Sequence, residues 1–257
     1  MNTKVISMAA FKGGCAKTTS TSAIGAALAS KLPSSKNNRI LLIDMDPQAN
    51  LTLGLGKDSE ENASIVSLLN DGTFEPISID ENLELIRGDR YLSAFAKEMN
   101  NDEFRKNFYL KEALEPIIKS EKYSHILIDL PPQESVIVIN ALTASNFVLS
   151  PCDSEYYAVS GLCNIEKMID SVQKYLNKNL EFLGVFITRF DSRKALHKQI
   201  KEMIQESYQD KLFQTEIKTN VALAEAAACG ETIFSYDDKS VGAKCYKKLA
   251  NELVGRI

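Results

Sequence analysis

Short apolar runs rich in β-branched residues alternate along the chain with longer segments of helical pattern. Such runs, bounded by turn residues, are typical of strands in a parallel sheet, and the longer segments are typical of crossover helices. The predicted strands span residues 4–10, 39–44, 82–86, 125–129, 146–150, 180–188 and 213–217. The predicted helices span residues 18–32, 161–175, 195–208, 221–228 and 241–256, with residues 91–119 mostly helical. This alternation predicts an α/β fold, a doubly wound, mostly parallel sheet with helices on both faces.

Length and composition are those of a single globular domain, which we expect to span residues 1–257. Hydrophobic residues make up 44% of the chain and charged residues 25%, and this balance excludes disordered, collagen-like and disulfide-scaffold classes. No apolar stretch is long enough to cross a membrane, and the first residues lack the apolar run of a signal peptide. The five cysteines are odd in number and lack metal-type spacing, which indicates reduced thiols and a cytoplasmic location.

Charged residues are distributed unevenly along the chain. The formal net charge of -4 argues against a uniformly basic surface that coats nucleic acid. Residues 180–257 nevertheless hold 12 basic and 11 acidic side chains, whereas residues 1–179 hold 18 and 23. The basic side chains of the C-terminal part form two groups: Arg189, Arg193, Lys194, Lys198 and Lys201, then Lys239, Lys244, Lys247 and Lys248. Lys194, Lys198 and Lys201 are spaced to share one helix face, which suits either a solvated surface or contacts with DNA phosphates.

A glycine-rich turn separates the first predicted strand from the first predicted helix, with the sequence FKGGCAKTT over residues 11–19. It departs from the Walker pattern G-x-x-x-x-G-K-[ST] at Phe11 and Ala16. Its glycine pair still allows backbone N–H groups to curl around phosphate oxygens, and the following helix adds the positive end of its dipole. Lys17 can reach the β- and γ-phosphates and the Thr18 hydroxyl can bind Mg²⁺, so the turn predicts a nucleotide site, although an ordinary strand-to-helix turn is the alternative.

Two acidic residues end predicted strands and support the same site. Asp44 closes the run over residues 39–44, and Asp129 closes the run over residues 125–129. Ligands of a doubly wound sheet gather at the carboxyl ends of the strands, so we expect both carboxylates beside the glycine-rich turn. There they can position an attacking water and hold the water shell of Mg²⁺. The alternative is that both residues only cap turns.

Several segments share their residues and spacing with one family of nucleotide-binding proteins. Three of them are Lys12-Gly13-Gly14-x-x-Lys17-Thr18-Thr19, Asp44-x-Asp46-Pro47-Gln48-Ala49-Asn50-Leu51-Thr52 and Ile128-Asp129-x-Pro131-Pro132. Further along are Asn140-Ala141-Leu142-Thr143-Ala144, Glu155-Tyr156-Tyr157-Ala158, Gly161-Leu162, Asp191-Ser192-Arg193 and Asn220-Val221-x-Leu223-x-Glu225-Ala226. Together these segments resemble the ParA/MinD family of P-loop NTPases, whose deviant Walker A motif has an extra early lysine, and its ParA/Soj partition branch in particular. The resemblance covers nearly the whole chain.

This resemblance implies an ATPase that uses ATP and Mg²⁺ and dimerises face to face with the nucleotides in the interface. Lys12 would contact the phosphates bound by the other subunit, Lys17 would neutralise those of its own, and Asp44 would orient the hydrolytic water. Thr18 would bind Mg²⁺, and Asp129 would act through the water shell of the metal. The residues implied in nucleotide binding are Lys12, Gly13, Gly14, Cys15, Ala16, Lys17, Thr18, Thr19 on the α-phosphate, and Asn220 near the adenine.

Some positions depart from the pattern of the family. Ala16 replaces the usual glycine, and because it directly precedes the helix we expect it to have helical backbone angles. Cys15 replaces a small aliphatic residue; we favour a neutral packing role over a redox-sensitive thiol. This chain has Lys-Thr at positions 218–219, where relatives often have Pro-Arg, and Ala222 where they often have an arginine. These last differences bear on the strength of DNA binding.

The resemblance also implies that the ATP dimer binds DNA non-specifically at the nucleoid and that a ParB-like partner stimulates hydrolysis in chromosome or plasmid partitioning. The DNA-binding residues expected are Arg189, Arg193, Lys194, Lys198, Lys201, Lys244, Lys247 and Lys248. Three other functions stay open: a MinD-like membrane switch, an iron–sulfur reductase that needs bridging cysteines, and a nucleotide-binding regulator with little turnover. A membrane switch requires an amphipathic C-terminal helix, but the sparse apolar face of residues 244–254 favours a helix packed on the sheet.

Overall fold

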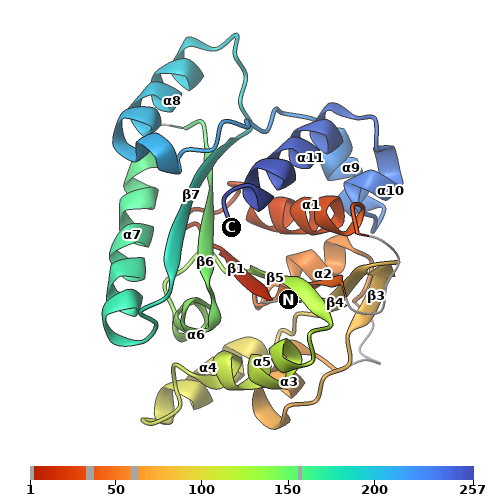
Figure 1. The fold of residues 1–257 in the computed structure, drawn as a ribbon, viewed down its shortest axis with the longest axis vertical. Helices are drawn as coiled ribbons and strands as arrows, with labels where there is room; N and C mark the ends of the chain where they lie inside the picture. Colours follow the sequence, from red (N-terminus) through yellow and green to blue (C-terminus); the bar gives the residue numbers. More distant parts are fainter. Residues whose placement is uncertain (1–2, 33–37, 59–62, 156–157) are drawn as a thin grey trace.

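The computed structural model describes residues 3–32, 38–58, 63–155 and 158–257. A seven-stranded sheet with the order β3-β4-β2-β5-β1-β6-β7 forms its centre (Figure 1). Neighbouring strands are parallel except at β3, which is antiparallel to β4. The strands are β1 (Lys4–Met8), β2 (Arg39–Asp44), β3 (Ile77–Asp80), β4 (Leu83–Ile86), β5 (Tyr123–Asp129), β6 (Phe147–Asp153) and β7 (Glu181–Thr188). The doubly wound, mostly parallel sheet predicted from the sequence is confirmed.

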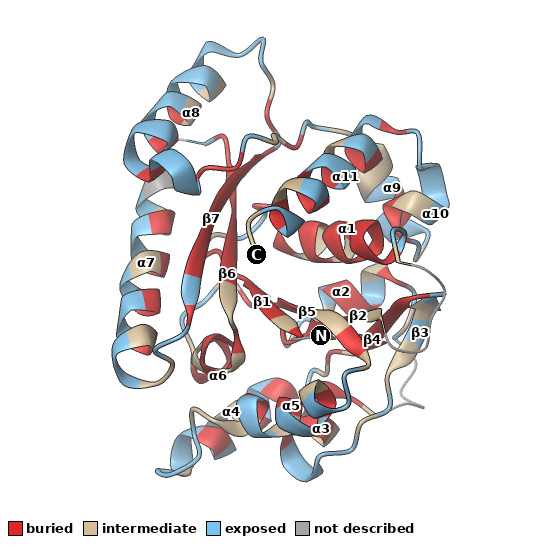
Figure 2. Ribbon diagram, in the orientation of Figure 1, coloured by how far each residue is buried: buried red, intermediate tan, exposed pale blue. Residues whose placement is uncertain are grey.

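Helices cover both faces of this sheet, so alternate strand residues enter two separate cores. Val5 and Leu41 belong to a core shared with α3 to α8, whereas Ile6 and Leu42 belong to a core shared with α1, α2 and α9 to α11. Figure 2 shows the central strands buried between these layers. The helices are α1 (Lys17–Ala29), α2 (Asn50–Gly54), α3 (Ile65–Asp71), α4 (Leu92–Asn101), α5 (Tyr109–Lys119), α6 (Val136–Ala144), α7 (Ala158–Tyr175), α8 (Ala195–Tyr208), α9 (Ala222–Ala228), α10 (Ile233–Asp237) and α11 (Val241–Val254). None of the described helices is long and apolar enough to cross a membrane.

The structure corrects some predicted elements near the ends of the strands. The first strand ends at Met8 rather than at residue 10, because the next residues already lead into the glycine-rich turn. Residues 213–217 form no strand of the sheet; Leu212 and Lys218, on either side of them, make only isolated bridges. The strand predicted to stop at residue 150 continues through Pro151, which pairs with Phe186, to Asp153.

Helix α6 is absent from the prediction for an identifiable reason. Its sequence VIVINALTA is apolar throughout and rich in β-branched residues, so it has no helical period. Its start depends on Ser135, whose hydroxyl accepts a hydrogen bond from the backbone N–H of Val138. The short elements α2, α3, α10 and β3 are also missing from the prediction, because each is too short to show a clear hydrophobic period.

The strand register brings the predicted site residues to one edge of the sheet. Asp129 on β5 lies beside Asp44 on β2 and beside Met8 on β1. The carboxyl ends of these three parallel strands therefore meet where the glycine-rich turn begins. The convergence expected from the sequence is found in the structure.

Candidate functional site

The loop between β1 and α1 forms a cradle at the carboxyl edge of the sheet. Gly13 and Gly14 are exposed in it, and Gly14 has a positive φ of 77°. Lys17 is buried within the loop, where its Nζ donates hydrogen bonds to the carbonyl oxygens of Ala10 at 3.0 Å and Lys12 at 3.2 Å. An ammonium group enclosed by a glycine-rich loop at the start of a helix suits the binding of phosphate.

Ala16 does not have the helical backbone angles expected from the sequence. It is the N-cap of α1, with φ of 69° and ψ of 29° in the left-handed region. A left-handed residue at the end of the turn helps to point successive N–H groups into the loop, which is why glycine is usual at this position. The expectation was wrong because an N-cap precedes the first helical residue and is not bound to helical angles. An alanine in this region costs about 1–2 kcal/mol relative to the right-handed conformation.

Asp44 and Asp129 are adjacent, fully buried acids. Oδ2 of Asp129 accepts a hydrogen bond of 2.7 Å from Oγ1 of Thr18, in the first turn of α1. Burial raises the pKa of both carboxyl groups, and the charge of Asp44 raises the pKa of Asp129 further. A cation bound by the Thr18 hydroxyl would offset the repulsion between the two carboxylates, so the residues present fit Mg²⁺. The described residues include no cluster of three acidic, histidine or cysteine side chains that could hold a metal ion alone.

Lys12 points away from the loop that Lys17 fills. Its Nζ lies 2.8 Å from Oδ2 of Asp153 and 2.5 Å from Oε2 of Glu155, at and just beyond the end of β6. Asp153 is buried, and its Oδ1 has no hydrogen-bond partner in the part of the chain that is described. Asp153 is not among the residues predicted for the site, because the predicted strand ends before it.

Cys15 is a packing residue of the same loop. Its side chain is buried and its Sγ donates to the carbonyl oxygen of Lys12 at 3.2 Å. Burial raises the pKa of the thiol, which keeps it neutral. These contacts agree with the neutral role favoured from the sequence.

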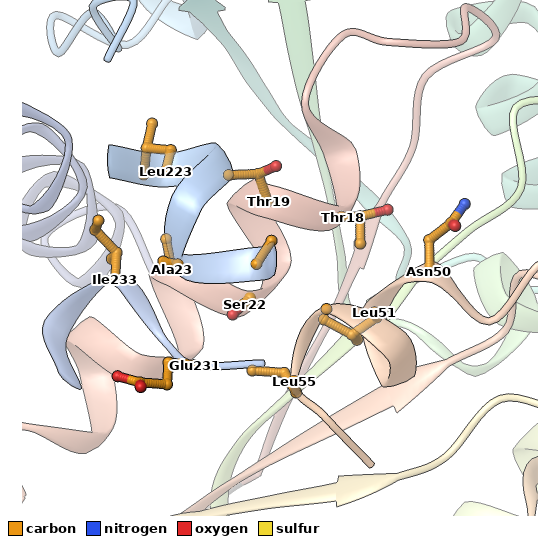
Figure 3. Close-up of a pocket in the computed structure, with 13 residues that line it drawn as sticks. Thr18, Thr19, Ser22, Ala23, Asn50, Leu51, Leu55, Leu223, Glu231 and Ile233 are labelled. Carbon is orange, nitrogen blue, oxygen red and sulfur yellow. The ribbon is translucent and has the colours of Figure 1, made fainter. Parts of the chain in front are cut away.

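A pocket adjoins the phosphate loop along the flank of α1 (Figure 3). Thr18 and Thr19 line it together with Leu51 of α2 and Leu223 of α9. Asn220 precedes α9, and its Oδ1 accepts a hydrogen bond of 3.2 Å from the backbone N–H of Gly242. No hydrogen bond from Nδ2 of Asn220 is found among the described residues, and its place near the adenine stays a prediction.

The basic residues expected to contact DNA differ in their surroundings. Arg189 lies against the phosphate loop rather than with the α8 group, because its Nη1 is 3.9 Å from where a Cβ on Gly14 would be. Arg193 forms an ion pair of 2.8 Å with Asp191 in the turn before α8. The lysines 194, 198, 244, 247 and 248 are exposed, and no ion pair is found for them among the described residues.

One basic residue that the sequence did not single out joins the two groups. Lys218 lines a groove with Lys244 and Lys248 of α11, and Glu216 lines the same groove. Glu216 also lines a second groove with Lys198 and Lys201 of α8, and it lies 2.5 Å from the Nζ of Lys201. We call Lys198, Lys201, Lys218, Lys244 and Lys248 the basic surface. Spacing in the sequence predicts the α8 and α11 groups separately, and only the tertiary structure brings these groups and Lys218 together.

Helix α11 is held on α1 through its apolar face. Tyr246, Leu249 and Leu253 are fully buried, and the Tyr246 hydroxyl lies 2.8 Å from the hydroxyl of Ser20 on α1. This is the packed helix favoured from the sequence, and these three side chains are not free to bind a membrane, whereas Val254 near its end is exposed.

Other segments of the resemblance have structural roles or lie outside the description. Asn140 on α6 is buried, and its side chain bonds to the backbone of Lys106 and Leu110, which fixes the turn before α5. Tyr156 and Tyr157 lie outside the described residues.

Several known proteins are similar to this chain over most of its length. Residues 3–182 match the family described as an AAA domain. The chromosome partitioning protein ParA of Caulobacter vibrioides is 33% identical over 258 residues, which cover 98% of this chain and 94% of that protein. The sporulation initiation inhibitor protein Soj of Bacillus subtilis is 37% identical over 255 residues, which cover 97% and 98%.

Solved structures with the same fold include some with a bound nucleotide or nucleotide analogue. A plasmid partition protein from Borrelia burgdorferi, bound to AMPPNP, superimposes with a TM-score of 0.82 at 26% identity over 99% of both chains. A cobyrinic acid a,c-diamide synthase from Mycobacterium smegmatis, with an ATP analogue and magnesium, has a TM-score of 0.83 at 29% identity, covering 98% of this chain and 94% of that one. Those ligands agree with the ATP and Mg²⁺ expected from the sequence. The chain belongs to the ParA/Soj branch of the ParA/MinD family of P-loop NTPases.

Proposed function

We propose that residues 1–257 act as one domain, an ATPase that dimerises with ATP, binds DNA non-specifically as a dimer and works with a ParB-like partner in chromosome or plasmid partitioning. The observation that carries the proposal is the phosphate loop, where buried Lys17 lies beside the Thr18–Asp129 hydrogen bond. The ATP analogue and magnesium in similar structures support the same ligands for this chain.

Hydrolysis would use groups that already have partners in the protein. ATP supplies the transferred phosphoryl group, and Mg²⁺ neutralises part of its charge. Lys17 would exchange two carbonyl oxygens for the β- and γ-phosphates, which are stronger acceptors because they are charged. The Thr18 hydroxyl would turn from Asp129 to the metal, and Asp129 would then accept from a water of its shell. Asp44 would hold the attacking water.

Dimerisation would move Lys12 from one set of anions to another. In the single subunit its ammonium group is bound by Asp153 and the exposed Glu155. Contact with the phosphates of a second subunit would replace these partners and place an extra positive charge at the transferred group. Such a charge supplied in trans accelerates hydrolysis by about 10³–10⁵ in other NTPases.

DNA binding would rest on the basic surface. Its exposed lysines are few in each subunit, and Glu216 compensates Lys201. An ATP dimer would present two copies, and two linked weak sites bind far more tightly than either one alone. We propose that the protein is cytoplasmic and associates with the nucleoid in this state.

The test is size-exclusion chromatography of Asp44→Ala with and without ATP, followed by DNA retention of any dimer. We expect a dimer only with ATP, retention of DNA by that dimer, and no ATP turnover. Lys198→Glu with Lys248→Glu should lose DNA but keep the ATP dimer, whereas the control Lys97→Glu with Lys111→Glu should keep both.

Failure of ATP to produce a dimer would refute the proposal. Flotation of the ATP dimer with anionic liposomes, together with no retention of DNA, would favour the MinD-like alternative. Binding of ATP without turnover by the wild-type protein, with DNA and partner present, would favour the nucleotide-binding regulator.

A further inference from the structure

The carboxylate of Asp44 has an unequal set of hydrogen bonds on its two oxygens. Oδ2 accepts two from Thr52, one from its backbone N–H at 2.9 Å and one from its Oγ1 at 2.7 Å. Oδ1 accepts one longer bond, 3.2 Å from the backbone N–H of Asp46. Each carboxylate oxygen can accept about two hydrogen bonds. Oδ2 is therefore saturated, and the remaining acceptor position of the carboxylate is on Oδ1.

Thr52 is held in turn by the loop that follows β4. The backbone N–H of Gly88 donates to Oγ1 of Thr52 at 2.7 Å, so the threonine hydroxyl accepts from Gly88 and must donate its proton to Asp44. This direction is fixed because Asp44 cannot donate when ionised and the Gly88 N–H cannot accept. Thr52 is almost fully buried, which excludes competing water.

Gly88 also limits the space around the carboxylate. A Cβ on Gly88 would lie 2.9 Å from both Cγ and Oδ2 of Asp44. The loop itself is anchored, because the Arg87 carbonyl oxygen accepts from Ile65 N–H at 2.9 Å and Asp89 accepts from the Ser64 hydroxyl at 2.6 Å. The start of α3 thus supports the loop that holds Thr52.

We propose that Thr52 is a positioning residue that, with Gly88, assigns the two oxygens of Asp44 different tasks: Oδ2 is fixed to the protein, and Oδ1 accepts from the hydrolytic water. The inference rests on the proposed function, in which Asp44 orients that water. Thr52 touches neither nucleotide nor water and acts only through Asp44. Its hydroxyl prevents the carboxylate from rotating and presenting the wrong oxygen.

The test compares Thr52→Val, which removes the hydroxyl but keeps the shape, with Thr52→Ser, which keeps the hydroxyl. We expect Thr52→Val to lower kcat for ATP by about tenfold to a hundredfold, since it removes a charge-assisted hydrogen bond, with KM unchanged within about twofold. Thr52→Ser should restore kcat to within about threefold of wild type. The control is Thr143→Val on α6, whose buried hydroxyl donates to the Ile139 carbonyl oxygen of its own helix; it should leave kcat unchanged.

Gly88→Ala approaches the same carboxylate at Oδ2 and keeps the test valid if Thr52→Val fails to fold. Its Cβ should displace Oδ2 and lower kcat without lowering affinity for AMPPNP. Wild-type kcat in Thr52→Val, equal losses in the valine and serine variants, or a raised KM at unchanged kcat would each overturn the inference. Absence of ATP turnover in the wild-type protein would instead refute the proposed function, so the two failures are distinguishable.

Discussion

The backbone conformation of Ala16 can be tested by a substitution to glycine, because the value of φ at this position decides whether glycine raises or lowers the free energy of unfolding. Ala16 is half-buried with φ of 69°, where Cβ lies too close to the following carbonyl oxygen. Glycine removes that cost of about 1–2 kcal/mol but loses about 0.4–1 kcal/mol through the greater freedom of the unfolded chain. We therefore expect Ala16→Gly to raise the free energy of unfolding by about 0.5–1 kcal/mol.

The matched control is Ala113→Gly, because Ala113 is also half-buried but lies inside α5. A glycine there should lower the free energy of unfolding by about 1 kcal/mol. Both variants are compared with wild type by urea unfolding without nucleotide, so that bound ligand does not add to stability. If Ala16→Gly loses as much stability as Ala113→Gly, the residue has helical angles and the left-handed conformation is refuted.

Three further tests concern charged and titratable groups. Lys12→Ala would leave Asp153 buried without its cation, so we expect the free energy of unfolding to fall by about 1–3 kcal/mol. The double variant Lys12→Ala with Asp153→Asn should recover most of this loss, because it has no buried charge without a partner. Burial lowers the pKa of His125 to about 4, so the unfolded chain takes up a proton below pH 6.5 while the folded state does not. Relative to His125→Gln, the wild-type protein should therefore lose about 2 kcal/mol of stability between pH 6.5 and pH 5, with no change in the difference above pH 6.5, as measured by urea titrations of both proteins. In the native protein a thiol reagent should modify the exposed cysteines promptly and Cys15 only on unfolding; prompt loss of the Cys15 thiol would indicate a reactive residue.

The sheet could be predicted because its strands are buried on both faces. Runs such as residues 39–44 are almost continuously apolar, and their order with intervening helices leaves few topologies. Helix α6 could not be identified this way, because a helix that is apolar all round has no period to distinguish it from a strand. The α3 helix depends on a capping box at Ser64 and Ser67 rather than on a long pattern.

In the candidate site, the positions of the acids that end strands could be predicted from the sequence. The positions of their hydrogen-bond partners could not. Asp44 and Asp129 follow from the rule that parallel strands end at one edge. The partners Thr52 and Gly88 come from different elements and meet Asp44 only after the chain has folded. The backbone of Ala16 was misjudged because a residue type constrains φ only weakly, while the turn before it fixes φ strongly.

The charged groups of the site have hydrogen-bond partners within the protein, and this bears on how a nucleotide would act. Lys17 is bound by carbonyl oxygens, Lys12 by two carboxylates and Asp129 by a threonine hydroxyl. In the proposed function, the bonds of Lys17 and Asp129 would break when phosphate and metal bind, and those of Lys12 would break on dimerisation. Ligand binding would then exchange partners instead of simply adding contacts. The net gain is then smaller than the sum of the new contacts, because the lost bonds are subtracted. A modest net gain would suit the proposed cycle of DNA binding and release, in which the nucleotide state must be reversed after hydrolysis.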